Sequence, residues 1–314
     1  MERNNKIFTS LWFVAFSAIL CCALWGSATP FIKIGYELIL PEKNVASTIL
    51  FAGIRFMFAG MLTIIIYSIA RKKILIPQKK NFDKVVKISC FQTVIQYVFF
   101  YIGLANTSGV KGTVLSGSNV FWAILIASLI FKQEKLTLKK LIACALGFAG
   151  IIVVNLEGLD LKMNFTGDCF VLFSAISYAT SSVLMKRYSK YEDPVVLSGW
   201  QFIVGGLFMI VAGLSFGGSV RIYNLQGAVV LVYLSFLSAI AYSLWGILLK
   251  HNPVSKVTVY SFMIPVFGVL LSWALLNERN SVSLVNLLIT LVLVCSGITL
   301  LNYKKTEDKN NEEK

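Results

Sequence analysis

Polar side chains at helical spacing stand inside otherwise apolar stretches of this chain, where they are suited to contact a solute. Gln92 and Gln96 are four residues apart in one stretch, and Asn119 lies three residues after Ser116 in the next. Spacings of three and four keep side chains on one face of a helix. Small residues at this spacing also serve plain packing between membrane helices, and that alternative stays open for Ser116. A carboxamide in hydrocarbon needs hydrogen-bond partners, so we favour a solute cavity for Gln92, Gln96 and Asn119.

Arg55 is the outstanding charge, because it stands well inside an apolar stretch. A charge in such a place is a functional hypothesis by default, and the planar guanidinium forms paired hydrogen bonds with a carboxylate. Two other interpretations stay open: the side chain extends to a polar surface, or it pairs with Glu37 or Glu42. Its counterpart in the repeat described below is the neutral Gln201, and we predict that both line the cavity.

Aromatic residues form a second group of candidates. They serve as mere anchors when they sit at membrane interfaces, but several of these lie away from the ends of their apolar stretches and beside polar residues. Aromatic faces combined with amide groups suit a planar or amphipathic organic solute. The aromatic residues predicted to line the cavity are Trp25, Tyr97, Tyr178, Trp200, Tyr242, Trp245 and Tyr260.

The elements that position these residues are helices of membrane-spanning length. Hydrophobic residues make up 57% of the 314 residues and charged residues only 14%, and a helix crosses a bilayer with about 20 apolar residues. We predict an all-α polytopic membrane protein with ten transmembrane helices. The expected spans are 10–33, 45–69, 86–105, 110–131, 138–155, 167–186, 195–214, 226–249, 256–276 and 283–302.

The charges predict the orientation of the chain. The net charge is +14, and 22 of the 29 lysines and arginines lie at the two ends of the chain or in alternate joints between spans. This is the positive-inside pattern, so we expect a plasma or inner membrane with both termini cytoplasmic, and no nucleic-acid partner. The six cysteines lie in or beside apolar runs without a C-x-x-C pair, so neither a disulfide framework nor a metal site is implied, and no cofactor is predicted.

The second half of the chain repeats the first. Tyr97 aligns with Tyr242, and the run Trp25–Lys33 aligns with Tyr178–Lys186. We divide the chain into an N-terminus (1–9), two five-helix repeats (10–155 and 167–302) and a charged cytoplasmic tail (303–314). Because five is odd, the second repeat enters the membrane from the other side. Such inverted repeats are common in secondary transporters; a duplicated scaffold without transport is the alternative.

These features resemble the drug/metabolite transporter superfamily, EamA type. The resemblance rests on Trp25-Gly26-Ser27 followed by Lys33, and on a closing Glu after the fourth helix of each repeat, Glu134 and Glu278. It covers nearly the whole chain and implies two five-helix repeats around a central cavity. It does not specify a substrate, because relatives move amino acids, sugars, nucleobases, other metabolites and drugs. The family often has Pro in each fourth helix; Pro265 keeps it, whereas Val120 stands at the first position.

Prolines mark places where helices bend. Pro265 falls in the middle of a span, and Pro30 falls late in the first span. Proline removes a helix hydrogen bond and kinks the axis, so we predict kinks at both, although Pro30 equally fits a simple helix end.

An enzyme is the least favoured class. Gly213-Leu-Ser-Phe-Gly217 matches the G-x-S-x-G pattern, but that pattern needs a strand–turn–helix context and a histidine. The charge count places Ser215 and the single histidine, His251, on opposite sides of the membrane, so no catalytic residue is predicted.

The sequence therefore predicts a secondary transporter of small organic metabolites, such as amino acids, related amphipathic solutes or drugs, working by alternating access. Export is favoured by the resemblance alone. The expected partners are a small-molecule substrate and the lipid bilayer, and a homodimer stays open. A channel or a scaffold is the alternative, although the sequence shows no pattern of charges that would form the rings typical of channels. The energy source also stays open, because no Asp or Glu lies clearly inside a span.

Overall fold

The protein is built from helices, as predicted. The computed structural model describes residues 2–42, 44–159, 164–276 and 283–302, and contains no strand within those ranges. Glu278 and the tail 303–314 lie outside the described residues. In the described part, nine helices are long and apolar enough to cross a membrane. A tenth, Leu138–Val154, has 17 residues and extends about 26 Å at 1.5 Å per residue, slightly less than the hydrocarbon layer. The chain is therefore an all-α integral membrane protein.

Seven spans are single, uninterrupted helices. A short helix, α1 (Glu2–Thr9), precedes them. The seven are α2 (Leu11–Ile39), α3 (Val45–Ala70), α8 (Leu138–Val154), α9 (Phe165–Tyr188), α10 (Pro194–Ser215), α11 (Leu225–His251) and α14 (Leu284–Asn302).

Three spans change their winding part of the way along. The third span contains a π-helical turn and the fourth ends in one, while the ninth contains a 3₁₀ turn. π-helical turns are frequent at functional sites. The segments are α4 (Phe82–Ser89), η2 (Cys90–Ile95) and α5 (Gln96–Ala105); α6 (Gly109–Gly117), α7 (Asn119–Leu125) and η3 (Ile126–Ile130); and α12 (Val254–Thr258), η5 (Val259–Phe262) and α13 (Met263–Leu276).

Local sequence explains where several helices begin and how far they run. Asn44, Asn164 and Asn224 cap α3, α9 and α11, because each side chain accepts a hydrogen bond from the backbone N–H three residues on, as is usual for an N-cap residue. Pro30, in contrast, does not end its helix: α2 continues to Ile39, so the interpretation of Pro30 as a helix end is wrong.

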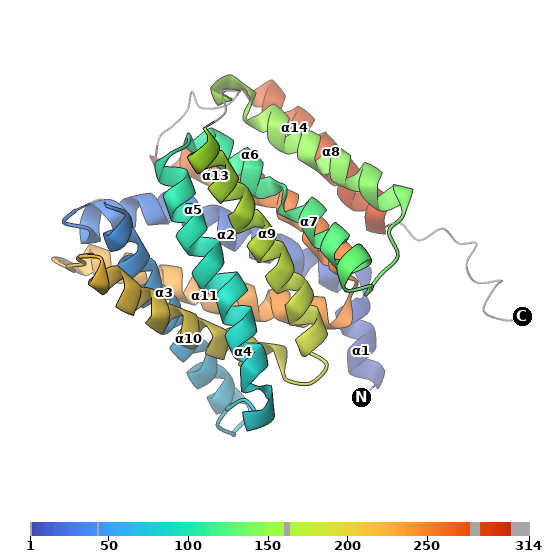
Figure 1. Cartoon of the computed structure of the whole chain (residues 1–314). Helices are drawn as coiled ribbons and strands as arrows, with labels where there is room; N and C mark the ends of the chain where they lie inside the picture. Colours follow the sequence, from blue (N-terminus) through green and yellow to red (C-terminus); the bar gives the residue numbers. More distant parts are fainter. Residues whose placement is uncertain (1, 43, 160–163, 277–282, 303–314) are drawn as a thin grey trace, which may run out of the picture.

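The equivalent helices α3 and α10 of the two repeats pack against each other closely (Figure 1). A Cβ atom added to Gly53 would lie 2.7 Å from the backbone nitrogen of Ile210, and one added to Gly206 would lie 2.6 Å from that of Met57. Only glycine permits so close an approach of two backbones, which is a common way for membrane helices to associate.

The last helices of the two repeats, α8 and α14, also lie side by side, along one edge of the bundle (Figure 1). Thr290 of α14 donates a hydrogen bond of 3.0 Å to the carbonyl oxygen of Gly150 in α8. This contact gives a buried hydroxyl a partner in the neighbouring helix. This pair of helices contributes none of the aromatic residues described below.

The joints between spans gather at two ends of the bundle. At one end, the backbone N–H of Gln78 donates to Glu192 and the ammonium of Lys186 donates to the carbonyl of Asn252. We call this the basic end, because its joints and flanking turns carry most of the lysines and arginines, including Arg71, Lys72, Lys73, Lys79, Lys80, Lys132, Lys135, Lys140, Arg187 and Lys190.

The other joints meet at the opposite end. There the hydroxyl of Thr107 donates to Asp168 at 2.7 Å, and the backbone N–H of Arg221 donates to the carbonyl oxygen of Ile39 at 2.9 Å. Lys111 adds an ion pair to Asp168 at 2.8 Å. Both ends are therefore tied by hydrogen bonds between the repeats.

Candidate functional site

Four of the predicted aromatic residues form a cluster around Trp25. The indole ring of Trp25 lies edge-on to Tyr242 at 5.1 Å, to Trp245 at 5.0 Å and to Tyr178 at 6.4 Å between ring centroids. Trp25 comes from α2, Tyr178 from α9, and the other two from α11. Edge-to-face contacts of this kind are the preferred geometry of aromatic pairs, and they bring together three helices from both repeats.

A second group of rings continues from Tyr242 toward α3 and α5. Phe202 lies 4.8 Å from Tyr242, Phe56 stacks on Phe202 at 5.0 Å, and Tyr97 lies 4.5 Å from Phe56. The hydroxyls of Tyr97 and Tyr242 are 3.1 Å apart and share a hydrogen bond. Phe56 and Phe202 were not predicted as site residues. They occupy matching positions in the two repeats, and this match in the sequence could have identified them. We call these seven residues together the aromatic cluster.

Arg55 reaches this cluster from α3. Its guanidinium carbon lies 4.3 Å from the ring centroid of Phe56 and 5.9 Å from that of Tyr97. The residue is only 3% exposed, so the interpretation in which it extends to a polar surface is wrong. Among the described residues no carboxylate lies within ion-pair distance of Arg55, and its Nε has no hydrogen-bond partner. The pairing with Glu37 or Glu42 is therefore not found.

The π-helical turn is joined to α10 and α9 by hydrogen bonds. Thr93 in this turn donates a hydrogen bond of 2.6 Å to the side-chain oxygen of Gln201 in α10. Ser177 of α9 donates to the carbonyl oxygen of Phe91 at 2.6 Å. Because the wider winding frees backbone carbonyls, a neighbouring hydroxyl satisfies one of them. Thr93 was missed by sequence reasoning, since a threonine in a span usually bonds to its own helix.

Several buried polar atoms of the predicted site residues have no partner within the described part of the chain. The acceptors are the side-chain oxygens of Gln92, Gln96 and Asn119, and the donors include the indole nitrogens of Trp25 and Trp245 and the Nε of Arg55. Buried polar groups are normally hydrogen-bonded, and leaving one unpaired costs about 1–3 kcal/mol. The unpartnered atoms therefore include both acceptors and donors for an amphipathic solute.

Other predicted residues lie elsewhere. The indole nitrogen of Trp200 donates to the carbonyl oxygen of Leu75 in a joint at the basic end, so this ring lies outside the aromatic cluster. Tyr260 is buried in the 3₁₀ turn, where its carbonyl oxygen accepts a hydrogen bond from Cys22. Ser116 uses its carbonyl oxygen to accept a hydrogen bond from Asn119. Pro265 is the third residue of α13 and follows the 3₁₀ turn η5 closely.

Glu134 forms a separate polar cluster at the basic end. One carboxylate oxygen accepts from the backbone N–H of Ser255 at 3.0 Å, and the other from the Ser255 hydroxyl at 2.5 Å and the Lys140 ammonium at 2.8 Å. Glu134 thereby joins the fourth span of the first repeat to the fourth span of the second. A carboxylate at a helix N-terminus is stabilised by the helix dipole.

The G-x-S-x-G segment lacks the environment of a nucleophile. Ser215 ends α10 and donates its hydroxyl to the carbonyl oxygen of Val211, whereas His251 ends α11 at the basic end and stacks on Phe8. Within the described ranges, no group of three or more His, Cys, Asp or Glu side chains is placed to hold a metal ion.

Comparisons with known proteins agree with this architecture. The chain matches the EamA-like transporter family twice, over residues 12–156 and 165–303. A solved crystal structure superposes with a TM-score of 0.77 over 93% of this chain and 97% of the other, at 17% sequence identity. That likeness concerns the fold alone.

Relatives are named mostly as transporters. An uncharacterized transporter of Bacillus subtilis (strain 168), YvbV, is 26% identical, and the match covers 98% of this chain and 96% of that protein. A probable amino-acid metabolite efflux pump of Escherichia coli (strain K12) is 26% identical over 83% of this chain and 86% of the pump. A WAT1-related chloroplastic protein of Arabidopsis thaliana is 27% identical over 71% of this chain, which spans about half the length of that protein.

Two matches to one family cover both halves of the chain, and each half contributes helices to the shared aromatic cluster. The chain belongs to the EamA-like transporter family.

Proposed function

We propose that this protein carries small amphipathic metabolites with a carboxylate group, such as amino acids, across the membrane by alternating access. The observation that carries this proposal is Arg55, a buried cation without a counter-ion in the described part of the chain. A buried charge left unpaired is strongly destabilising, and a substrate carboxylate would supply the missing partner with paired hydrogen bonds.

The rest of the region suits the other parts of such a substrate. The unpartnered oxygens of Gln92, Gln96 and Asn119 would accept hydrogen bonds from a substrate ammonium group. The aromatic faces of Trp25 and Tyr242 would attract the same cation or pack against an apolar side chain. A zwitterion with an apolar body therefore satisfies more of these groups than a sugar would.

Alternating access is supported by pairs of equivalent residues that meet between the repeats. Phe56 stacks on Phe202, and Tyr97 bonds to Tyr242, so a solute at this point would lie between two related halves. Inverted repeats allow one half to rock against the other around such a site. A cytoplasmic basic end agrees with the positive-inside rule, and export across a plasma membrane agrees with the name of the Escherichia coli relative.

The test is transport by the purified protein in liposomes. Labelled amino acids, nucleobases, sugars and aromatic cations would be offered separately, with empty liposomes as the control. We expect saturable entry of an amino acid, accelerated by unlabelled substrate on the far side. Entry that does not saturate would favour a channel, and saturable entry of sugars alone would contradict the role given to Arg55.

A further inference from the structure

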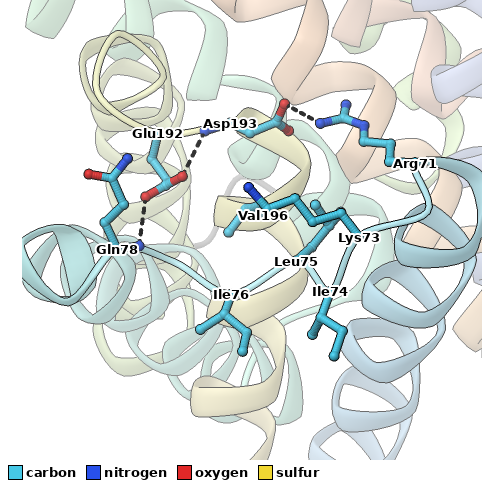
Figure 2. Close-up of a pocket in the computed structure, with 9 residues that line it drawn as sticks. All are labelled: Arg71, Lys73, Ile74, Leu75, Ile76, Gln78, Glu192, Asp193 and Val196. Carbon is cyan, nitrogen blue, oxygen red and sulfur yellow. Dashed lines mark hydrogen bonds and ion pairs between the residues drawn. The ribbon is translucent and has the colours of Figure 1, made fainter.

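A pocket of about 280 Å³ lies at the basic end, away from the aromatic cluster (Figure 2). It is formed by the joint that follows α3 and by the start of α10. Both helices are of membrane-spanning length. The pocket therefore lies where these two spans end, which is the level of the lipid head groups.

The joint that walls the pocket is held in place by hydrogen bonds. The backbone N–H of Leu75 donates to the Ser68 hydroxyl at 3.0 Å, and the carbonyl oxygen of Leu75 accepts from the indole of Trp200 at 2.9 Å. Lys72 turns the chain with a φ of 50°. Because both backbone groups of Leu75 are bonded, this part of the wall is already fixed, and its ordering costs little conformational entropy when a ligand binds.

The two carboxylates at the pocket already have partners. Asp193 forms an ion pair with Arg71 at 2.7 Å and caps α10 through the N–H of Val195. Glu192 accepts hydrogen bonds from the backbone N–H of Gln78 at 3.0 Å and from Asn81 at 3.1 Å. These bonds leave neither carboxylate as a free site for a cation.

The cations around the pocket exceed these carboxylates. In the part of the chain that the structure describes, no ion pair engages Lys73, whose side chain lines the pocket, or its neighbours Lys72, Lys79 and Lys80. Arg71 keeps 44% of its side chain exposed while it pairs with Asp193. The lining itself is balanced, with Arg71 and Lys73 against two carboxylates, and the surplus of positive charge comes from the three lysines that stand beside it in the chain.

Two exposed isoleucines complete the lining. Ile74 is 73% exposed and Ile76 is 64% exposed, and in Figure 2 both side chains point away from Arg71 and from the two carboxylates. Exposed aliphatic side chains next to an anion site gain nothing from a freely soluble phosphate, because that ion has no hydrocarbon for them to contact. They suit a ligand in which an anion is joined to hydrocarbon.

We propose that this pocket binds the head group of an anionic phospholipid. The phosphate would lie against Lys73 and the outer side of Arg71, and the first methylene groups of the acyl chains would lie against Ile74 and Ile76. The proposal does not depend on the transported substrate, since none of these residues belongs to the aromatic cluster.

The test is lipid binding by the purified full-length protein in neutral detergent. Phosphatidylglycerol and phosphatidylcholine would be titrated, and retained lipid would be counted by native mass spectrometry. We expect phosphatidylglycerol to bind more tightly. A Lys73→Gln variant should bind it about fivefold more weakly, from the usual contribution of one basic residue near an anionic surface. Lys135→Gln removes the same charge from an exposed position in another joint at this end, and should bind as the wild type does.

Further arms separate a lipid from a free anion. Ile76→Gln should weaken phosphatidylglycerol binding but leave binding of its deacylated head group, glycerophosphoglycerol, unchanged. Three results would overturn the proposal: equal affinity for the two lipids, equal losses in Lys73→Gln and Lys135→Gln, or deacylated head group binding as tightly as intact lipid.

Discussion

The hydroxyl oxygen of Tyr97 lies 3.1 Å from that of Tyr242, so two residues that align in the repeat touch across the interface between the repeats. Tyr97 belongs to α5 and Tyr242 to α11. Next to them the equivalent Phe56 and Phe202 stack with nearly parallel rings, at 4°. The two repeats therefore meet through matching residues inside the cluster where we propose that the substrate binds.

The hydrogen bond between these two tyrosines should matter for transport. We expect Tyr97→Phe and Tyr242→Phe each to lower the transport rate about fivefold, because a hydrogen bond between neutral groups contributes about 1 kcal/mol. If the hydroxyls act through each other, the double variant should be no slower than either single variant. Initial rates in liposomes measure this, and multiplied effects in the double variant would show independent roles.

Arg55 should decide which solutes are carried. In Arg55→Gln, we expect transport of solutes with a carboxylate to fall by about tenfold or more, since hydrogen bonds to charged groups contribute about 1.5–3 kcal/mol. Amides of the same solutes should lose much less. Competition by the acid and its amide against one labelled substrate provides the measurement, and equal losses for both would argue against carboxylate pairing.

The unpartnered amides provide a third prediction. Gln96→Leu and Asn119→Leu remove buried acceptors that have no partner among the described residues. Stability should change little or increase, because an apolar replacement removes the desolvation cost, whereas transport should fall. Thermal unfolding and liposome uptake must be measured on the same samples. Unchanged uptake would remove these residues from the proposed site.

Glu134 should hold the basic end closed. In Glu134→Gln the charge that binds Lys140 and the Ser255 hydroxyl is lost, so the start of α12 should open more often. We expect hydrogen exchange of the amides in 254–258 to accelerate about tenfold, the equivalent of about 1.4 kcal/mol. Glu157→Gln is the matched control. Glu157 is an acid in the joint that precedes α9, and its carboxylate accepts a hydrogen bond from Asn286, so this variant should leave hydrogen exchange in 254–258 unchanged.

The contact between α3 and α10 should tolerate no added side chain. Gly53→Ala places a methyl group 2.7 Å from the Ile210 nitrogen, and such overpacking usually costs about 1–3 kcal/mol. Gly109→Ala is the matched control, since nothing lies within 4 Å of its added methyl group. Unfolding temperatures in detergent compare the two variants, and equal temperatures would contradict the tight packing described for α3.

The sequence by itself determined the helical membrane fold and the family. Ten apolar stretches, the alternation of basic joints and the duplicated motifs are all properties of residue order, because a span must be apolar along its whole length. Arg55 and the aromatic residues Trp25, Tyr97, Tyr178, Tyr242 and Trp245 were also singled out from the sequence, as residue types that are costly or unusual in hydrocarbon, but their contacts with one another were not.

Only the tertiary structure decided which faces of the helices meet. A soluble helix reveals its buried face by an apolar stripe, but a membrane helix is apolar toward both lipid and protein, so the sequence of α3 or α10 does not indicate its inner side. Trp200 was therefore predicted in the cavity, yet it contacts Leu75 at the basic end. Phe56 and Phe202 were missed for the same reason. Their place depends on how closely Gly53 and Gly206 bring two backbones together, a distance that arises only when both helices are packed.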